Sequence, residues 1–181
     1  MSEASAFCET TGGALYAARM LEVVVEETMN CTPDDFLEFV LDVHRYAEVD
    51  DKIGTIDWAR RDGDLTEFKF RPVLPGIPGP APKMVMWVRR VPGTSIEMSM
   101  APLPHNRWIR HLVRFDASFE CTPVEGGTRV RSVTSMDVTP AARWLMEAIL
   151  RRTLPGNIRG EMDRAKVYLD RQTRQKQAHH G

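Results

Sequence analysis

This chain of 181 residues has few cysteines, almost no net charge and no long apolar run. The three cysteines (Cys8, Cys31 and Cys121) have no metal-ligand spacing, so we expect inert free thiols in a reducing cytoplasm. No run of about eighteen consecutive apolar residues occurs, which excludes a transmembrane helix. Residues 1–19 have no apolar core segment and are therefore not expected to act as a secretory signal peptide.

Charge is almost balanced, with a net value of −1 and a sequence pI of about 6.5. The charge of the whole chain therefore gives no indication of a nucleic-acid or anionic-membrane partner. The length corresponds to one domain with a sizeable core. Ten methionines are many for this length, and methionine suits an adaptable pocket but equally fills gaps in a solid core.

The C-terminal third of the chain predicts one long amphipathic helix. Thr139 and Pro140 supply an N-cap oxygen and a proline at the first helical position. Apolar residues then recur at helical spacing: Ala141, Trp144, Leu145, Ala148, Ile149, Ile158, Met162, Ala165 and Leu169. Pro155 and Gly156 interrupt this pattern, and we expect a kink or a one-turn break there. The helix must bury its apolar stripe, and the preceding strands offer the only large surface for it.

Most of the preceding chain has the alternating pattern of strands. After a first β-rich run at 20–29, a capping signal from Thr32 to Asp35 predicts a short helix, followed by a second helical turn at 44–46. Six further strands are predicted at 53–61, 64–71, 83–91, 94–100, 108–121 and 128–138. The predicted domain spans 20–172, between a disordered leader (1–19) and a disordered tail (173–181).

The connections between these strands fall into two groups. Asp62-Gly63, Pro92-Gly93 and Glu125–Gly127 predict tight turns, whereas Pro72–Pro82 and Ala101–Arg107 are long. Successive turns of a meander lie at opposite ends of the sheet, so the tight turns share one end. The two long loops lie at the opposite end of the sheet, which we call the long-loop end. The start of the final helix and segment 47–52 lie at this end as well. Loops of this length in a compact domain are usually functional or disordered.

The order of one strand, two short helices, a six-stranded meander and a long helix resembles the helix-grip arrangement of the START-like (SRPBCC) superfamily. This superfamily includes START lipid-transfer domains, birch-allergen-like plant proteins and bacterial polyketide cyclases and dehydrases. Three stretches are similar to its first-helix signature, its last hairpin and the second half of its long helix: Thr32–Asp50, Glu125–Pro140 and Gly156–Gln172. The family commonly has a tryptophan just after the second short helix, but here that stretch reads AEVDD and Trp58 follows later.

The resemblance implies an α+β fold in which a curved, seven-stranded antiparallel sheet wraps around the C-terminal helix. It also implies a cavity between sheet and helix for a hydrophobic small molecule. The predicted ligand-binding residues are the inward-facing ones: Trp58, Phe68, Phe70, Met84, Met86, Val88, Ile96, Met98, Met100, Val113, Phe115, Thr134, Met136, Met146 and Ile149. The same composition fits a solid core, so the existence of the cavity is left open at this stage.

His111 is the candidate catalytic residue, because it shares the inward row of the predicted strand 108–121 with apolar residues. It is interpreted as a general acid or base, with Arg71 or Tyr46 as an orienting donor. The alternative is a core histidine that a backbone carbonyl satisfies. No serine or cysteine completes a nucleophilic triad, and no paired histidines suggest an iron site, so neither a metal nor a cofactor is predicted.

Further polar and aromatic groups are expected at the pocket mouth: Tyr46, Asp50, Asp51, His105, Arg107 and Trp108. Three functions follow from the sequence. The one favoured is a polyketide cyclase or dehydratase-like protein, and the alternative is a non-catalytic lipid, isoprenoid or quinone carrier. The third is an interaction domain with a filled core. The expected partner is a hydrophobic small molecule, without nucleic acid or an integral membrane segment, and the oligomeric state is open.

Overall fold

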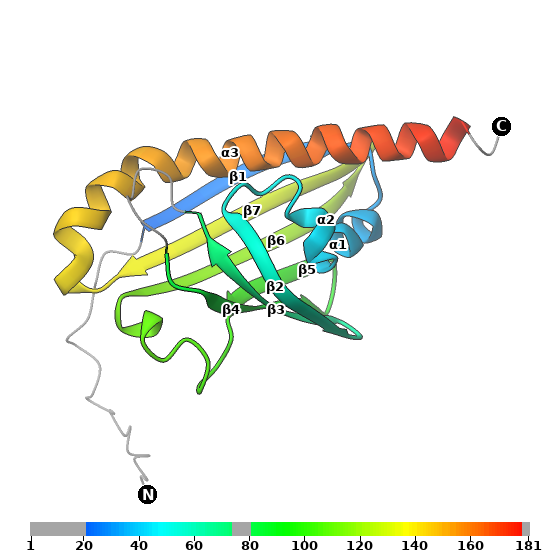
Figure 1. The fold of residues 1–181 in the computed structure, drawn as a ribbon. Coiled ribbons are helices and arrows are strands. Elements are labelled where there is room, and N and C mark those ends of the chain that lie inside the picture. Colours follow the sequence, from blue (N-terminus) through cyan, green and yellow to red (C-terminus); the bar gives the residue numbers. More distant parts are fainter. Residues whose placement is uncertain (1–20, 74–80, 179–181) are drawn as a thin grey trace, which may run out of the picture.

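The computed structural model describes residues 21–73 and 81–178 (Figure 1). The predicted leader and most of the Pro72–Pro82 loop lie outside these residues. The elements in chain order are β1 (Leu21–Met29), α1 (Pro33–Leu41), α2 (Val43–Tyr46), β2 (Ile53–Asp62), β3 (Leu65–Pro72), β4 (Met84–Val91), β5 (Ser95–Met100), the 3-10 turn η1 (Ile109–His111), β6 (Val113–Val124), β7 (Gly127–Val138) and α3 (Pro140–Ala178). None of the helices in this described part has the length and hydropathy needed to cross a membrane.

The strands form one antiparallel sheet in the order β1-β7-β6-β5-β4-β3-β2. Six strands follow one another as a meander, and β1 joins the far edge by pairing with β7. The predicted tight turns are present, and Gly63, Gly93 and Gly126 adopt the positive φ values of 56°, 95° and 81° that favour glycine. The sheet curves around α3, which packs along β1 and β7 (Figure 1). The predicted helix-grip fold is therefore confirmed.

Helix α1 begins at the predicted capping signal. The Thr32 hydroxyl accepts a hydrogen bond from the Asp35 backbone N–H, and the Asp35 carboxylate accepts one from the Thr32 N–H. The helix buries an apolar face of Phe36, Leu37, Phe39, Val40 and Leu41. It packs at the tight-turn end of the sheet, where Thr66 of β3 donates a hydrogen bond to the Leu41 carbonyl.

Helix α3 is continuous through Pro155, so the predicted one-turn break is absent. Its first turns run at an angle to the rest (Figure 1), as expected where a proline removes the N–H that would bond the carbonyl of Arg151. The helix extends to Ala178 and includes residues 173–178, which were expected to belong to the tail. Its buried stripe includes Leu154, Ile158, Met162, Ala165 and Leu169.

Strand β6 begins five residues later than the sequence predicts. Residues 109–111 form the 3-10 turn η1, and regular pairing starts with Val113 opposite Val138. Arg110 causes this difference, because its guanidinium Nη2 donates to the carbonyls of Met100 and Ala101 at 2.7 and 2.9 Å. These bonds hold the chain folded back against the end of β5, where it cannot pair as a strand.

Candidate functional site

The inward positions of the sheet form a continuous apolar surface beneath α3. Cross-strand neighbours link Val88 to Met98, Met98 to Ala117, and Ala117 to Thr134 along one row. Ten of the predicted ligand-binding residues are buried: Phe68, Phe70, Met84, Met86, Val88, Ile96, Met98, Met100, Thr134 and Met136. The alternation of these strands therefore identified the inner face correctly, and whether a ligand binds there is a separate question.

Burial on this inner face changes from one end of the sheet to the other. At the end covered by α1, the exposed fractions of Ile96 and Phe119 are 0% and 2%. Toward the long-loop end, those of Phe70, Met84 and Met136 rise to 7%, 8% and 9%. Val113 and Phe115, at the beginning of β6, are only half-buried. The interior is thus closed to solvent near α1 and slightly more accessible to solvent toward the long-loop end.

Three of the remaining predicted lining residues depart from full burial. Met146 and Ile149 of α3 are half-buried. Trp58 lies opposite Lys69 in the pairing of β2 with β3, whereas Ala59 lies opposite the inward-facing Phe68. The pairing of β2 is irregular between Ile53 and Trp58, and this irregularity moves Trp58 to the outer face. There the guanidinium of Arg60 lies 5.2 Å from the centre of its ring.

The structure does not bring the three predicted catalytic residues together. His111 is exposed on η1, so its expected inward position on a strand is wrong. Arg71 is half-buried and its guanidinium donates to the Ala81 carbonyl at 2.8 Å, across the base of the β3–β4 loop. Tyr46 is buried beneath α3 and has a different set of partners.

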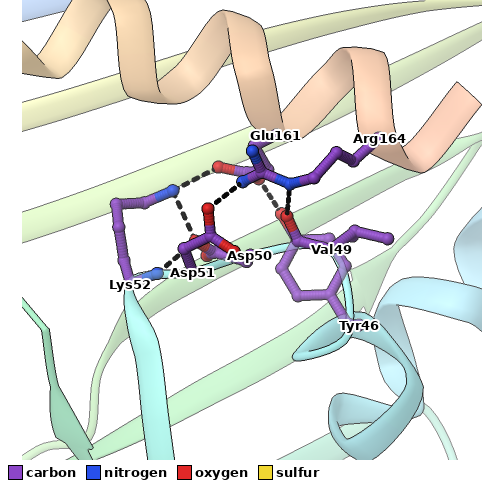
Figure 2. Close-up of polar contacts among 7 residues, drawn as sticks. All are labelled: Tyr46, Val49, Asp50, Asp51, Lys52, Glu161 and Arg164. Carbon is purple, nitrogen blue, oxygen red and sulfur yellow. Dashed lines mark hydrogen bonds and ion pairs between the residues drawn. The ribbon is translucent and has the colours of Figure 1, made fainter.

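Those partners form a buried polar network at the middle of α3 (Figure 2). The Tyr46 hydroxyl donates to Glu161 Oε1, and Lys52 Nζ donates to Glu161 Oε2. Lys52 Nζ also lies 2.5 Å from Asp50 Oδ1. Glu161 is only 3% exposed, and both Tyr46 and Asp50 are buried. The network therefore joins α3, the end of α2 and the loop before β2 in the protein interior.

A second pair of contacts fixes the same loop from the solvent side. Arg164, one turn after Glu161 on α3, donates to the Val49 carbonyl at 2.7 Å. Its Nη2 lies 2.9 Å from the exposed carboxylate of Asp51 (Figure 2). The 47–52 loop is thus held to α3 by one buried and one exposed set of charges.

Burial and neighbouring charges shift the pKa values of the network. Burial raises the pKa of Glu161 from 4.5 to about 7, the negative charge of Asp50 adds to this rise, and Lys52 and Tyr46 oppose it. Burial alone would lower the pKa of Lys52, but Glu161 and Asp50 outweigh it and raise that pKa above 10.5. Burial and the charge of Glu161 also raise the pKa of the Tyr46 phenol. An interior carboxyl with a pKa near neutrality is suited to proton transfer.

The sequence contained a signal for Glu161 that the prediction missed. Glu161 follows Ile158 by three residues and precedes Ala165 by four, so it lies on the buried face of the helix. A carboxylate within an apolar stripe requires a buried partner. Lys52 and Tyr46 are that partner, but they lie 109 and 115 residues away in the chain.

A groove of about 220 Å³ lies outside this interior, between α1 and the last turns of α3. Its charged groups are paired within the protein: Lys176 with Asp35 at 2.7 Å, and Arg45 with Gln172 at 2.7 Å. Among the described residues, no three His, Cys, Asp or Glu side chains form a group that would hold a metal ion.

Changing Glu161 to glutamine is expected to change how stability depends on pH. Between pH 4.5 and 7 the folded carboxyl holds a proton that the unfolded chain has released, so its contribution to stability falls as pH rises. Relative to Glu161→Gln, the wild type should lose as much as about 3 kcal/mol of unfolding free energy across this window. Urea denaturation of both proteins at four pH values from 5 to 8 measures the difference. A difference that stays constant with pH would contradict the raised pKa.

Residues 20–170 match the family described as "Polyketide cyclase / dehydrase and lipid transport". No curated protein matches the chain. The match to the family covers the whole described sheet, both short helices and most of α3.

Three solved structures illustrate the similarity of fold. The protein TTHA0849 from Thermus thermophilus is 13% identical, with a TM-score of 0.65, over 82% of this chain and 97% of that one. The Zhui aromatase/cyclase from Streptomyces sp. R1128 is 12% identical, with a TM-score of 0.64, over 86% and 96%. A START superfamily protein from Mycobacterium smegmatis is 13% identical, with a TM-score of 0.56, over 84% and 97%. At these identities the likeness concerns the fold alone.

Proposed function

Because the chain belongs to the polyketide cyclase / dehydrase and lipid transport family, we propose that it binds an apolar, polyketide-like small molecule between the sheet and α3 and acts on it as a cyclase or dehydratase. The observation that carries this proposal is the change in burial along the inner face, which becomes slightly more accessible to solvent toward the long-loop end. An apolar lining with few polar groups is typical of small-molecule sites. The ligand would occupy the more accessible half, near Phe70, Met84 and Met136.

In this proposal Glu161 replaces His111 as the group that handles protons. Its carboxylate would accept the proton that a cyclisation or dehydration removes from a substrate carbon, and its pKa of about 7 suits a base at neutral pH. Lys52 and Tyr46, which bond its two oxygens, would set its basicity. Thr134, buried beside Ala117 on the inner face, offers a hydroxyl that can orient a ligand carbonyl.

A non-catalytic carrier for a lipid, isoprenoid or quinone is the second candidate. It is favoured by the observation that several of the buried polar groups are already paired within the protein. Tyr46 and Lys52 both donate to Glu161, and the buried hydroxyls of Thr66 and Thr128 donate to backbone carbonyls. A carrier needs the apolar surface but no unpaired acid or base.

Enlarging Ala117 to phenylalanine tests the binding site. Ala117 points inward between Met98 and Thr134, so the added ring would fill the proposed ligand space. Wild type should be stabilised against heat by at least one of a set of fatty acids, quinones, isoprenoids and aromatic polyketides. In Ala117→Phe that shift should disappear, with binding weakened at least tenfold. The matched control is Ser118→Phe, because the neighbouring Ser118 is half-buried on the other face of β6.

Two results would contradict the proposed site. One is the failure of every ligand in the set to stabilise the wild type, and the other is unchanged binding by Ala117→Phe. Mass spectrometry of the incubated ligand separates the two candidate functions. Conversion by wild type and its loss in Glu161→Gln would support the enzyme, whereas binding without conversion would support the carrier.

A further inference from the structure

A local concentration of basic and apolar side chains distinguishes the segment between β5 and β6. Residues 98–115, which include the end of β5 and the start of β6, contain three arginines and two histidines but no aspartate or glutamate, although the net charge of the whole chain is −1. Three of the most exposed large apolar residues of the described chain also lie here: Trp108 at 81%, Leu103 at 67% and Leu112 at 48%. The balanced charge of the whole chain therefore conceals a basic, apolar surface at the long-loop end.

This segment projects beyond the sheet (Figure 1) but has a fixed backbone. The Asn106 side chain bonds both polar groups of Val85: its Oδ1 accepts from the N–H at 2.9 Å and its Nδ2 donates to the carbonyl at 2.7 Å. Arg110 binds the carbonyls of Met100 and Ala101. These side chains fix the loop to β4 and β5. Trp108 lies between them in the chain, so its exposed position is set by the fold.

The other charged groups of the loop remain at the surface. Arg107 and Arg114 are exposed, and within the described residues neither has a recorded ion-pair partner. The acidic groups around the segment are Glu97 and Asp116, which flank it in the chain, Glu67, whose Oε1 is 3.9 Å from His105 Nε2, and Asp137, opposite Arg114 in the sheet. The loop thus presents apolar tips flanked by free guanidinium groups.

We propose that this surface, formed by Leu103, Arg107, Trp108 and Leu112 of the loop and by Arg114 at the start of β6, docks the protein on an anionic lipid surface. Tryptophan favours the boundary between headgroups and acyl chains, and exposed leucines gain free energy by entering the apolar layer. Arginines beside them bind lipid phosphates and are attracted by a negative surface potential.

The size of the surface favours a bilayer over a protein partner. Three apolar side chains on one projecting loop offer far less than the roughly 800 Å² that each partner contributes to a stable protein interface. A few inserted side chains together with basic neighbours are, by contrast, enough for reversible membrane attachment. The loop lies at the more solvent-accessible end of the interior, so docking would bring the proposed ligand space next to the lipid.

Flotation of the full chain with lipid vesicles tests the docking surface. Wild type should float with vesicles of 70% phosphatidylcholine and 30% phosphatidylglycerol at 100 mM NaCl. It should not float with pure phosphatidylcholine, and its association should weaken at 500 mM NaCl because salt screens the attraction. Trp108→Ala should weaken binding about tenfold or more, and Arg107→Ala/Arg114→Ala about 25-fold.

The matched control is Arg129→Ala/Arg152→Ala, which removes two exposed arginines elsewhere on the protein and should bind vesicles more strongly than the Arg107/Arg114 variant. Far-UV circular dichroism and Tm should be unchanged in every variant, because the replaced side chains are exposed. Absence of flotation by wild type would overturn the proposal, as would equal flotation by all variants. Dimerisation that Trp108→Ala abolishes, without vesicle binding, would instead assign the loop to self-association. None of these outcomes depends on the ligand screen.

Discussion

Replacing Lys52 by methionine is expected to lower the free energy of unfolding by about 3–5 kcal/mol at pH 8. Lys52 is the cation for two buried carboxylates, Glu161 and Asp50, and methionine keeps its length without its charge. At pH 8 the variant must either bury two unpaired negative charges or protonate one of them, and both cost free energy.

The loss should be smaller at pH 5, where Glu161 holds its proton in the folded state. Adding Glu161→Gln to Lys52→Met should recover much of the loss at pH 8, because the two residues act as a coupled pair. The control is Lys166→Met, which breaks the partly exposed pair with Glu27 and should cost much less. Chemical denaturation of the wild type and of each variant at both pH values measures these free energies. A Lys52→Met loss that is independent of pH, or equal to that of Lys166→Met, would refute a buried charge network.

Phe119→Ala is expected to destabilise the protein by about 3–5 kcal/mol. Its ring packs edge-to-face against Phe36 at 5.5 Å and Tyr46 at 6.1 Å between centroids, in the closed half of the interior. Because α1 and α2 are held in place by their own packing and caps, the space left by the ring would remain as a cavity.

Phe115→Ala is the control for this prediction. Phe115 lies on the same strand and face, four residues toward the long-loop end, and is half-buried. Its removal should cost less than half as much, because a half-buried ring makes fewer contacts than a fully buried one. Guanidinium denaturation of the two variants compares the two ends directly. Equal losses would mean equally tight packing throughout, which would remove the basis for a ligand space.

The fold was predictable because local signals agreed with one another along most of the chain. The glycines of the tight turns, the Thr32–Asp35 cap and the alternation in β3, β5 and β7 each have a physical cause within a few residues. The start of β6 was not predictable in this way. The apolar spacing of Ile109 and Val113 fits a strand, but hydrogen bonds from Arg110 to the end of β5 hold residues 109–111 in a 3-10 turn.

The candidate site was less predictable than the fold for a related reason. Trp58 was assigned to the inner face because an irregular pairing with β3 leaves no mark in the alternation of β2. His111 was assigned inward on a strand that had not yet begun. The helical position of Glu161 was visible in the sequence, but its partners belong to a loop that only the folded chain brings beneath α3.

The position of β1 also determines when the sheet can be completed. Leu21 pairs with Met136 and Met29 with Thr128, so the first strand to be synthesised must wait for the last one. The hairpins between β2 and β7 need only short stretches of chain, whereas joining β1 closes a loop of about a hundred residues and costs correspondingly more entropy. Topologies with such distant pairings fold slowly. Until β7 leaves the ribosome, the apolar residues of β1 have no native partner. The nascent chain is therefore exposed to aggregation during this interval, unless the interval is short or a chaperone covers β1.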